Sequence, residues 1–189
     1  TKLKSQIGSR KFWLAASTHK GEEEIILQVH QNLKKDFPDL LTILIPRHPN
    51  RAEEIKSLFN GINFAQRSKN QNIENTTEIY LADSLGELGT FYRLANFTFL
   101  GGSLLPIGGH NPFEPIKLEC AVITGSHVFN FKEIYENLRQ ENACVIVESA
   151  GELTKKVTVF LNNSSLSKAF SDKASNLITN SENIAAKII

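Results

Sequence analysis

The chain has 189 residues, of which 41% are apolar and 22% are charged, and its formal net charge is +1. A chain of this length can bury roughly 70% of its unfolded surface in one core, so we expect a single domain over residues 1–189. The near-neutral charge argues against a nucleic-acid partner, and no apolar run reaches the ~20 residues of a membrane span. Cys120 and Cys144 lack the spacing of a zinc site or a disulfide framework, and we expect two buried thiols in a reducing compartment.

Short apolar runs alternate with helical patterns along the whole chain. In order, the sequence predicts a strand at 12–16, a helix at 22–36, a strand at 40–46, a helix at 51–59, a strand at 63–66, a polar surface loop at 68–77, a strand at 78–82, a helix at 84–94, a strand at 97–100, a helix from 112, a strand at 121–124, a helix at 131–139, a strand at 144–147, and helices at 150–161 and from 166. Strands without polar alternation, each followed by a helix, predict an α/β fold, a Rossmann-like parallel sheet with helices on both faces.

The segment 101–115 carries four glycines and runs into the signals that start a helix. Glycine lets a ligand approach the backbone, and the free N–H groups of a helix N-terminus attract an anion. Asn111 is predicted to cap this helix, Pro112 to lie in its first turn and Glu114 to complete a capping box. We therefore expect an anion site here, with a glycine-rich turn that only joins two elements as the alternative.

Three further junctions between a strand and a helix carry polar residues, at 17–22, 46–49 and 83–87. In an open parallel sheet, ligands bind beyond the carboxyl ends of the strands. Arg47 offers a forked cation for a phosphate, Gly86 and Glu87 offer backbone donors and a carboxylate, and Glu114 could accept hydrogen bonds from ribose hydroxyls. Together these segments predict a nucleotide site. The sequence holds no Rossmann glycine fingerprint after the first strand, no P-loop, no nucleophile elbow and no metal-ligand cluster, so we expect no metal and a different kind of nucleotide site.

Several polar residues have a simpler explanation. His19 and His48 could satisfy loop carbonyls, and His30 lies among Gln and Lys and is expected to be exposed. The acidic run 22–24 favours the positive end of its helix and needs no other role. Ser84 with Glu87, and Asn130 with Glu133, have the spacing of capping boxes.

At these segments the sequence resembles the C-terminal half of 3-deoxy-D-manno-octulosonic acid (Kdo) transferases. The resemblance rests on five motifs: Ala16-Ser17-Thr18-His19 with Gly21-Glu22; Arg47-His48-Pro49; Asp83-Ser84-Leu85-Gly86-Glu87-Leu88; Gly101-Gly102-Ser103 through Gly108-Gly109-His110-Asn111 with Glu114-Pro115; and Asn130-Phe131. It covers about residues 10–160, and the glycine-rich motif is highly specific to that family.

The resemblance implies the donor-binding half of a two-domain GT-B glycosyltransferase that moves Kdo from CMP-Kdo to the lipid A precursor of lipopolysaccharide. By position, the CMP contacts would be Pro46, Arg47, Leu85, Gly86, Glu87, Asn111, Pro112, Phe113 and Glu114, with Ser17, His48, Gly108, Gly109 and His110 as additional donor-site candidates. The family often has Met where Leu85 stands, and a backbone contact would survive that change. No cofactor and no metal are implied.

The resemblance also implies that the general base, a glutamate, and the acceptor site belong to an N-terminal domain absent from this chain. The chain begins at Thr1 and contains no Met, and we expect it to be a piece of a longer protein. The piece is expected to be soluble, to bind CMP weakly and to transfer nothing alone, while the full-length protein would act at the cytoplasmic face of the bacterial inner membrane. Leu161, Leu166 and Phe170 are expected to expose apolar surface where the missing domain would pack.

Two alternatives remain open at this point. One is a GT-B-like nucleotide-sugar epimerase, which would favour UDP over CMP. The other is a non-catalytic nucleotide-binding domain, which would keep CMP affinity without transfer.

Overall fold

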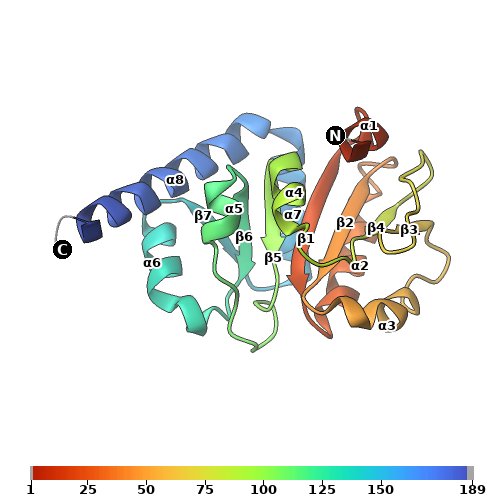
Figure 1. The fold of residues 1–189 in the computed structure, drawn as a ribbon, viewed down its shortest axis with the longest axis horizontal. Helices are drawn as coiled ribbons and strands as arrows, with labels where there is room; N and C mark the ends of the chain where they lie inside the picture. Colours follow the sequence, from red (N-terminus) through yellow and green to blue (C-terminus); the bar gives the residue numbers. More distant parts are fainter. Residues whose placement is uncertain (1, 187–189) are drawn as a thin grey trace.

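A computed structural model describes residues 2–186 of the chain, and the side-chain environments of residues 2–179 (Figure 1). Its centre is a seven-stranded sheet in which every pair of neighbouring strands is parallel, in the order β3-β4-β2-β1-β5-β6-β7. The strands are β1 (Phe12–Thr18), β2 (Leu41–Pro46), β3 (Phe64–Gln66), β4 (Ile79–Leu81), β5 (Phe97–Leu100), β6 (Ala121–Gly125) and β7 (Cys144–Val147). The predicted fold class is confirmed, and all seven predicted strands are present.

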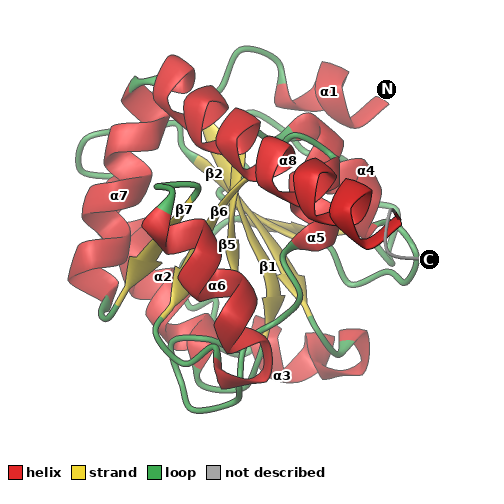
Figure 2. Cartoon of the chain, turned by 90° about the vertical axis from the view of Figure 1, so that its left-hand side faces the viewer, coloured by secondary structure: helices red, strands yellow, loops and turns green. Residues whose placement is uncertain are grey.

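Helices cover both faces of this sheet (Figure 2). They are α1 (Lys2–Ile7), α2 (Glu22–Leu33), the 3₁₀ turn η1 (Pro49–Arg51), α3 (Ala52–Lys56), α4 (Leu88–Leu94), α5 (Phe113–Lys117), the 3₁₀ turn η2 (Phe129–Phe131), α6 (Lys132–Gln140), α7 (Ala150–Asn162) and α8 (Ser164–Ala186). Figure 2 shows α2 and α7 on one side of the sheet and α4, α5 and α8 on the other. No helix within the described residues combines the length and apolar character needed to cross a membrane.

Strand β1 shows why the sheet needs helices on both faces. Trp13 and Ala15 belong to the core cluster beneath α2, α3 and α7, whereas Leu14 and Ala16 belong to the cluster beneath α1 and α4. Successive side chains of a strand point to opposite faces, so an apolar run can be buried only if both faces are covered. The continuous burial of β1 and β2 follows from this geometry.

Several predicted details are wrong. Helix α2 ends at Leu33, three residues before the predicted end at residue 36. In place of the predicted helix 51–59, the chain forms a 3₁₀ turn followed by a five-residue helix. Helix α1 was not predicted, because its six residues are too few to show a periodic pattern.

The three apolar residues expected to be exposed at the C-terminal helices are partly buried against the core. Leu161, Leu166 and Phe170 pack against the cluster that contains Phe160, and the Phe160 and Phe170 rings lie 5.5 Å apart between centroids. All three side chains are half-buried, so only part of their apolar surface is exposed. Further along, α8 packs directly on the sheet, where Ala174 and Ile178 share a core cluster with Val122 of β6.

His30 was expected to be exposed, but its side chain is 1% exposed. Its Nδ1 atom lies 2.9 Å from the Thr42 hydroxyl, which also accepts a hydrogen bond from the indole N–H of Trp13 at 2.7 Å. Burial lowers the pKa of His30 to about 4, against the raising effect of Glu78. The partner of this histidine lies on the next strand, which periodicity within α2 does not reveal.

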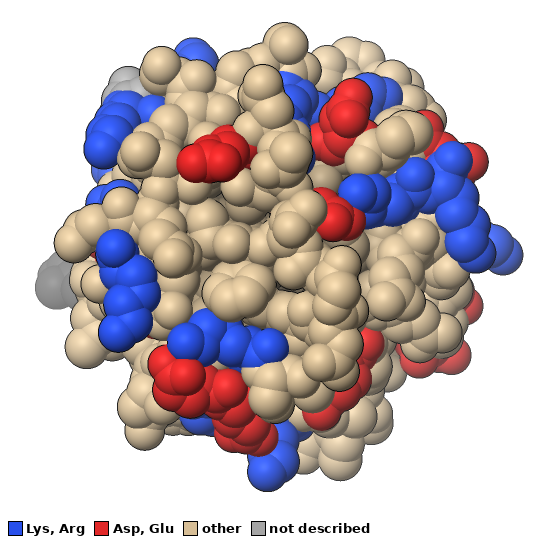
Figure 3. All heavy atoms as spheres, turned by 90° about the vertical axis from the view of Figure 1, so that its right-hand side faces the viewer, with Lys and Arg blue, Asp and Glu red and all other residues tan. Residues whose placement is uncertain are grey.

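The expectation of two buried thiols is confirmed, since Cys120 and Cys144 are both free and buried. Burial raises the pKa of both. The face nearest β3 and α3 carries lysines and arginines interspersed with acidic residues (Figure 3). No field of a single sign covers that face.

Candidate functional site

The sheet has one topological switch point, between β1 and β5. These strands are neighbours, but the chain leaves β1 toward β2 and leaves β5 toward β6. Loops that leave adjacent strands in opposite directions open a crevice at the carboxyl edge of a sheet, where ligands bind. The segment after β1 and the glycine-rich loop after β5 face one another at this point, the lower edge in Figure 1.

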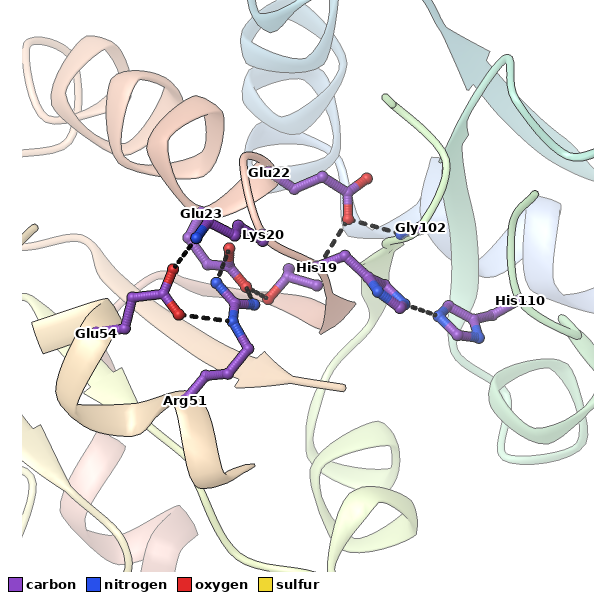
Figure 4. A network of polar contacts seen from close by, with 9 residues as sticks. His19, Lys20, Glu22, Glu23, Arg51, Glu54, Gly102 and His110 are labelled. Carbon is purple, nitrogen blue, oxygen red and sulfur yellow. Dashed lines mark hydrogen bonds and ion pairs between the residues drawn. The ribbon is translucent and has the colours of Figure 1, made fainter. Parts of the chain in front are cut away.

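The glycine-rich loop already holds an anion, the carboxylate of Glu22. Glu22 is completely buried, and its two oxygens accept hydrogen bonds from the backbone N–H groups of His19 at 3.0 Å, Gly102 at 2.6 Å, Ser103 at 2.9 Å and Leu104 at 3.0 Å. Figure 4 shows the contacts with His19 and Gly102. The expectation that the acidic run needs no other role is therefore wrong. The first amides of the loop are occupied by the protein itself, so they are not free for a ligand phosphate.

Glu23, the next residue, is also completely buried. It receives two hydrogen bonds from the Arg51 guanidinium, at 3.0 and 3.3 Å, and one from the Thr18 hydroxyl at 3.0 Å (Figure 4). Burial raises the pKa of Glu23, while the contacts with Arg51 oppose that change. The pair ties the start of α2 to η1, the turn that follows Arg47 and His48.

The glycines of this loop serve close packing within the protein. A Cβ atom on residue 101 would lie 2.6 Å from the carbonyl oxygen of Ser17, and one on residue 108 would lie 2.1 Å from the side-chain amide nitrogen of Asn130. Asn130 therefore packs on the loop and also donates its backbone N–H to the Gly108 carbonyl at 3.0 Å. The predicted capping box at 130 is wrong, because α6 begins at Lys132 with no side-chain cap.

Three histidines meet at the switch point. The Nε2 atoms of His19 and His110 lie 2.9 Å apart and their rings stack with centroids 5.1 Å apart, while His48 packs edge-on against His19 at 5.6 Å. Burial lowers the pKa of His19. Burial, together with the nearby charge of His19, lowers the pKa of His110 to about 4. We call these three residues the histidine cluster. The sequence predicted His48 and His110 as donor-site candidates and placed His19 in one of the polar segments of the expected nucleotide site, with a contact to a loop carbonyl as its simpler role.

Arg47 is exposed beside this cluster and has no side-chain partner among the described residues. Its backbone N–H donates to the Thr18 carbonyl at 2.9 Å, which extends the pairing of β2 with β1 by one residue beyond Pro46. The same bend holds Ser17 in the left-handed region, with φ 56°. Non-glycine residues in that region are uncommon and cluster at functional sites.

The segment 83–87 is held from the side of β3. Asp83 accepts hydrogen bonds from the Gln66 amide at 2.6 Å and from Ser68, and Arg67 makes a two-point ion pair with Glu87 at 2.5 and 2.9 Å. The hydrogen bonds from Arg67 and Ser84 lower the pKa of Glu87 to about 2. The predicted capping box is wrong, since Ser84 contacts the Glu87 side chain and α4 begins at Leu88 without a side-chain cap.

Between Ser84 and Glu87 the chain turns through Gly86, where φ is 77°. The turn leaves Leu85 with 81% of its surface exposed. The sequence did not single out Arg67, because an arginine in a polar loop gives no indication that it pairs with Glu87.

The start of α5 also differs from the prediction. The helix begins at Phe113, with Pro112 at the cap position, and no side-chain cap is formed. Asn111 instead accepts the backbone N–H of Phe113 at 2.9 Å. Glu114 is exposed, and a Cβ atom on Gly89 would lie 3.4 Å from its carboxylate oxygen. Asn111, Phe113 and Glu114 line a cavity of about 570 Å³ between α4 and α5.

The structure thus brings Ser17, Arg47, His48 and His110 together at the switch point, and places Asn111, Phe113 and Glu114 along the same glycine-rich connection. Within the described residues, no group of three or more His, Cys, Asp or Glu side chains is arranged to hold a metal ion. The arrangement offers one permanent cation, three imidazoles and an open cavity, a set suited to an anionic ligand with a large neutral part.

The comparisons with known proteins agree with one another. The chain is 41% identical over 161 residues to a 3-deoxy-D-manno-octulosonic acid transferase of Haemophilus influenzae, covering 84% of this chain and 38% of the relative. It is 34% identical over 188 residues to the enzyme of that name from Rickettsia felis, covering 97% of this chain and 40% of the relative. The chain spans less than half the length of these curated relatives. No protein-family model matches it.

Among solved structures, the chain is similar to the C-terminal CMP-Kdo binding domain of WaaA from Acinetobacter baumannii. The two superpose with a TM-score of 0.88 at 32% identity, and the match covers 94% of each chain.

Proposed function

Because this chain belongs to the Kdo transferase family, as its C-terminal domain, we propose that it binds the sugar donor CMP-Kdo. The observation that carries the proposal is the 32% identity, over 94% of both chains, to a domain described as binding CMP-Kdo. Its fold is that of the C-terminal domain of a GT-B glycosyltransferase. The switch point of the sheet supports the same assignment, since the segments 17–22 and 46–49 and the connection after β5, which the sequence predicted as parts of a nucleotide site, meet there.

In this proposal, Arg47 holds the phosphate and the cavity between α4 and α5 takes the nucleoside. Arg47 is the exposed cation at the switch point that has no carboxylate partner among the described residues. The carboxylate of Glu114, which lines the cavity, is placed to accept hydrogen bonds from ribose hydroxyls. The remaining CMP contacts are the predicted ones: Pro46, Leu85, Gly86, Glu87, Asn111, Pro112 and Phe113.

The carboxylate of Glu87 enters this site already paired with Arg67. A ligand that contacted it directly would have to share it with that guanidinium. The backbone N–H groups of the turn at 85–87 are the better donors, and their positions depend on the same ion pair.

For the whole protein, we propose transfer of Kdo to the lipid A precursor in lipopolysaccharide biosynthesis, at the cytoplasmic face of the inner membrane. The acceptor site and the general base would lie in an N-terminal domain outside this chain, and the chain alone would transfer nothing. Arg47 would stabilise the charge on the departing CMP phosphate. No finding supports either alternative, the epimerase or the non-catalytic domain.

Calorimetric titration with CMP tests the donor site, with UMP, UDP and AMP as competing nucleotides. We expect selective binding of CMP, and a loss of at least about tenfold in affinity in Arg47→Ala, because a hydrogen bond to a charged group contributes roughly 1.5–3 kcal/mol. Arg139→Ala is the matched control, since Arg139 is exposed on α6, away from the switch point. A preference for UDP, or equal loss in both variants, would contradict the proposal.

A further inference from the structure

The histidine cluster joins three loops that are far apart in the sequence. His19 follows β1, His48 follows β2 and His110 lies in the connection after β5, so the three rings stand at the ends of three adjacent strands. Figure 4 shows the His19 and His110 side chains reaching toward one another across the crevice. A Cβ atom on Gly102 would lie 3.1 Å from the His110 ring and 3.3 Å from the His19 ring. The bare backbone there is what allows the two rings to stack.

The contact between His19 and His110 limits how many protons the pair can hold. With 2.9 Å between the two Nε2 atoms, one nitrogen must donate and the other must accept. The pair can be neutral, or can carry one extra proton, but a second extra proton would leave two donors facing each other. Within the described part of the chain, the Nδ1 atom of neither ring has a hydrogen-bond partner. A singly protonated pair therefore has N–H groups to spare for an outside acceptor.

Burial and the surrounding cations disfavour protonation of the pair when no ligand is bound. Burial and the cations Arg47 and Arg51, together with His48, lower the pKa of His19, and Glu22 opposes them. Burial, His19, Arg47 and His48 lower the pKa of His110, again against Glu22. An anion that enters between Arg47 and the rings reverses this balance, since a nearby opposite charge favours the protonated imidazole.

We propose that the histidine cluster is a second anion subsite, beside Arg47, which binds the carboxylate of the donor sugar and takes up one proton as it does so. This inference rests on the proposed function, because it assumes that the ligand is CMP-Kdo. That donor carries two anionic groups, the phosphate of CMP and the acid group of the octulosonic acid. The switch point offers two matching groups: the permanent cation Arg47, and the hydrogen-bonded pair of His19 and His110, which can take up one proton. The proton comes from the solvent, and no bond of the sugar changes.

Proton uptake can be measured directly by titration calorimetry in two buffers with different ionisation enthalpies. The titration is run at about pH 5.5, above the pKa of about 4 that burial gives His110 in the free chain, and an adjacent carboxylate favours the protonated imidazole. We expect uptake approaching one proton with CMP-Kdo, and clearly less with CMP. In His110→Gln and in His19→Gln this uptake is lost, and the ratio of CMP-Kdo affinity to CMP affinity falls roughly tenfold. Far-ultraviolet circular dichroism checks that both variants are folded.

His127→Gln is the matched control, because His127 is exposed after β6 and lies outside the cluster. It should keep both the proton uptake and the affinity ratio. Equal uptake with CMP and CMP-Kdo would overturn the inference, since the cluster would then face the phosphate. Binding of both ligands without uptake would overturn it while leaving the proposed function intact. If neither ligand bound, the proposed function would fail, and this inference with it.

Discussion

Replacement of Glu22 by Gln should destabilise the chain far more than any substitution of an exposed acidic residue. Each carboxylate oxygen of Glu22 accepts two backbone N–H groups: one oxygen those of His19 and Gly102, the other those of Ser103 and Leu104. Glutamine has nearly the same shape but presents an NH₂ group in place of one oxygen. Whichever way it is turned, two backbone donors lose their acceptor and face another donor.

The magnitude follows from the cost of leaving those donors buried and unpaired. Each unsatisfied buried group costs about 1–3 kcal/mol, so two cost about 4 kcal/mol. That is a large part of the roughly 5–15 kcal/mol by which a folded domain is stable. For a chain of this size it corresponds to a fall in Tm of roughly 10 °C.

Urea unfolding, monitored by the fluorescence of Trp13, measures the free energy of unfolding of Glu22→Gln and of a control variant. Glu24→Gln is the matched control, since Glu24 is exposed in the same first turn of α2 and should lose only the helix-dipole effect of roughly 0.5 kcal/mol. A difference of less than about 1 kcal/mol between the two variants would refute the role assigned to Glu22.

Three further changes test other parts of the structure. The pKa of His30 is about 4 in the folded chain, against an unperturbed value of 6.5. The free energy of unfolding should therefore fall by up to about 1.4 kcal/mol per pH unit as the pH drops from 6.5 toward 4. Unfolding curves of His30→Gln measured at several pH values should lack this contribution of His30 to the pH dependence. Gly125→Ala should lower Tm sharply in thermal melts, because its Cβ atom would lie 2.1 Å from the backbone oxygen of Ser103; a wild-type Tm would contradict the close approach. Arg67→Ala should weaken CMP binding a few fold in calorimetry, because the half-exposed ion pair with Glu87 holds the turn before α4; unchanged affinity would show that this turn does not contact the nucleotide.

The fold could be predicted from the sequence because the information is local and repeated. Apolar strands alternate with helical patterns, with a polar loop only after the strand at 63–66, and this leaves a parallel sheet covered on both faces as the consistent arrangement. The position of the site followed from the same pattern, because polar residues directly after the strands must meet at one edge. Helix starts were predicted less well: at 84, 111 and 130 the residues have the types of a capping box but make other contacts.

The polar contacts that hold the site together could not be predicted, since their partners are distant in the sequence. Glu22 lies first in an acidic run at a helix start, a pattern that looks the same whether the carboxylate faces water or a loop 80 residues away. His30 looks like an exposed residue until β2 places Thr42 beside it. A single sequence records the residue types, but tertiary contacts decide which of them are buried.

The occupation of the glycine-rich loop by Glu22 changes what the chain needs in order to bind a phosphate. A run of glycines before a helix is expected to cradle an anion with its own N–H groups, but here three of those groups bind a buried carboxylate, and α5 has only five residues. The negative charge of Glu22 also lies close to the crevice, where it favours positive charge. The loop therefore acts as a rigid support that carries His110, and attraction for an anion must come from side chains. Arg47 supplies a positive charge that does not depend on protonation. The Arg47→Ala titration is therefore the most direct test of the donor site.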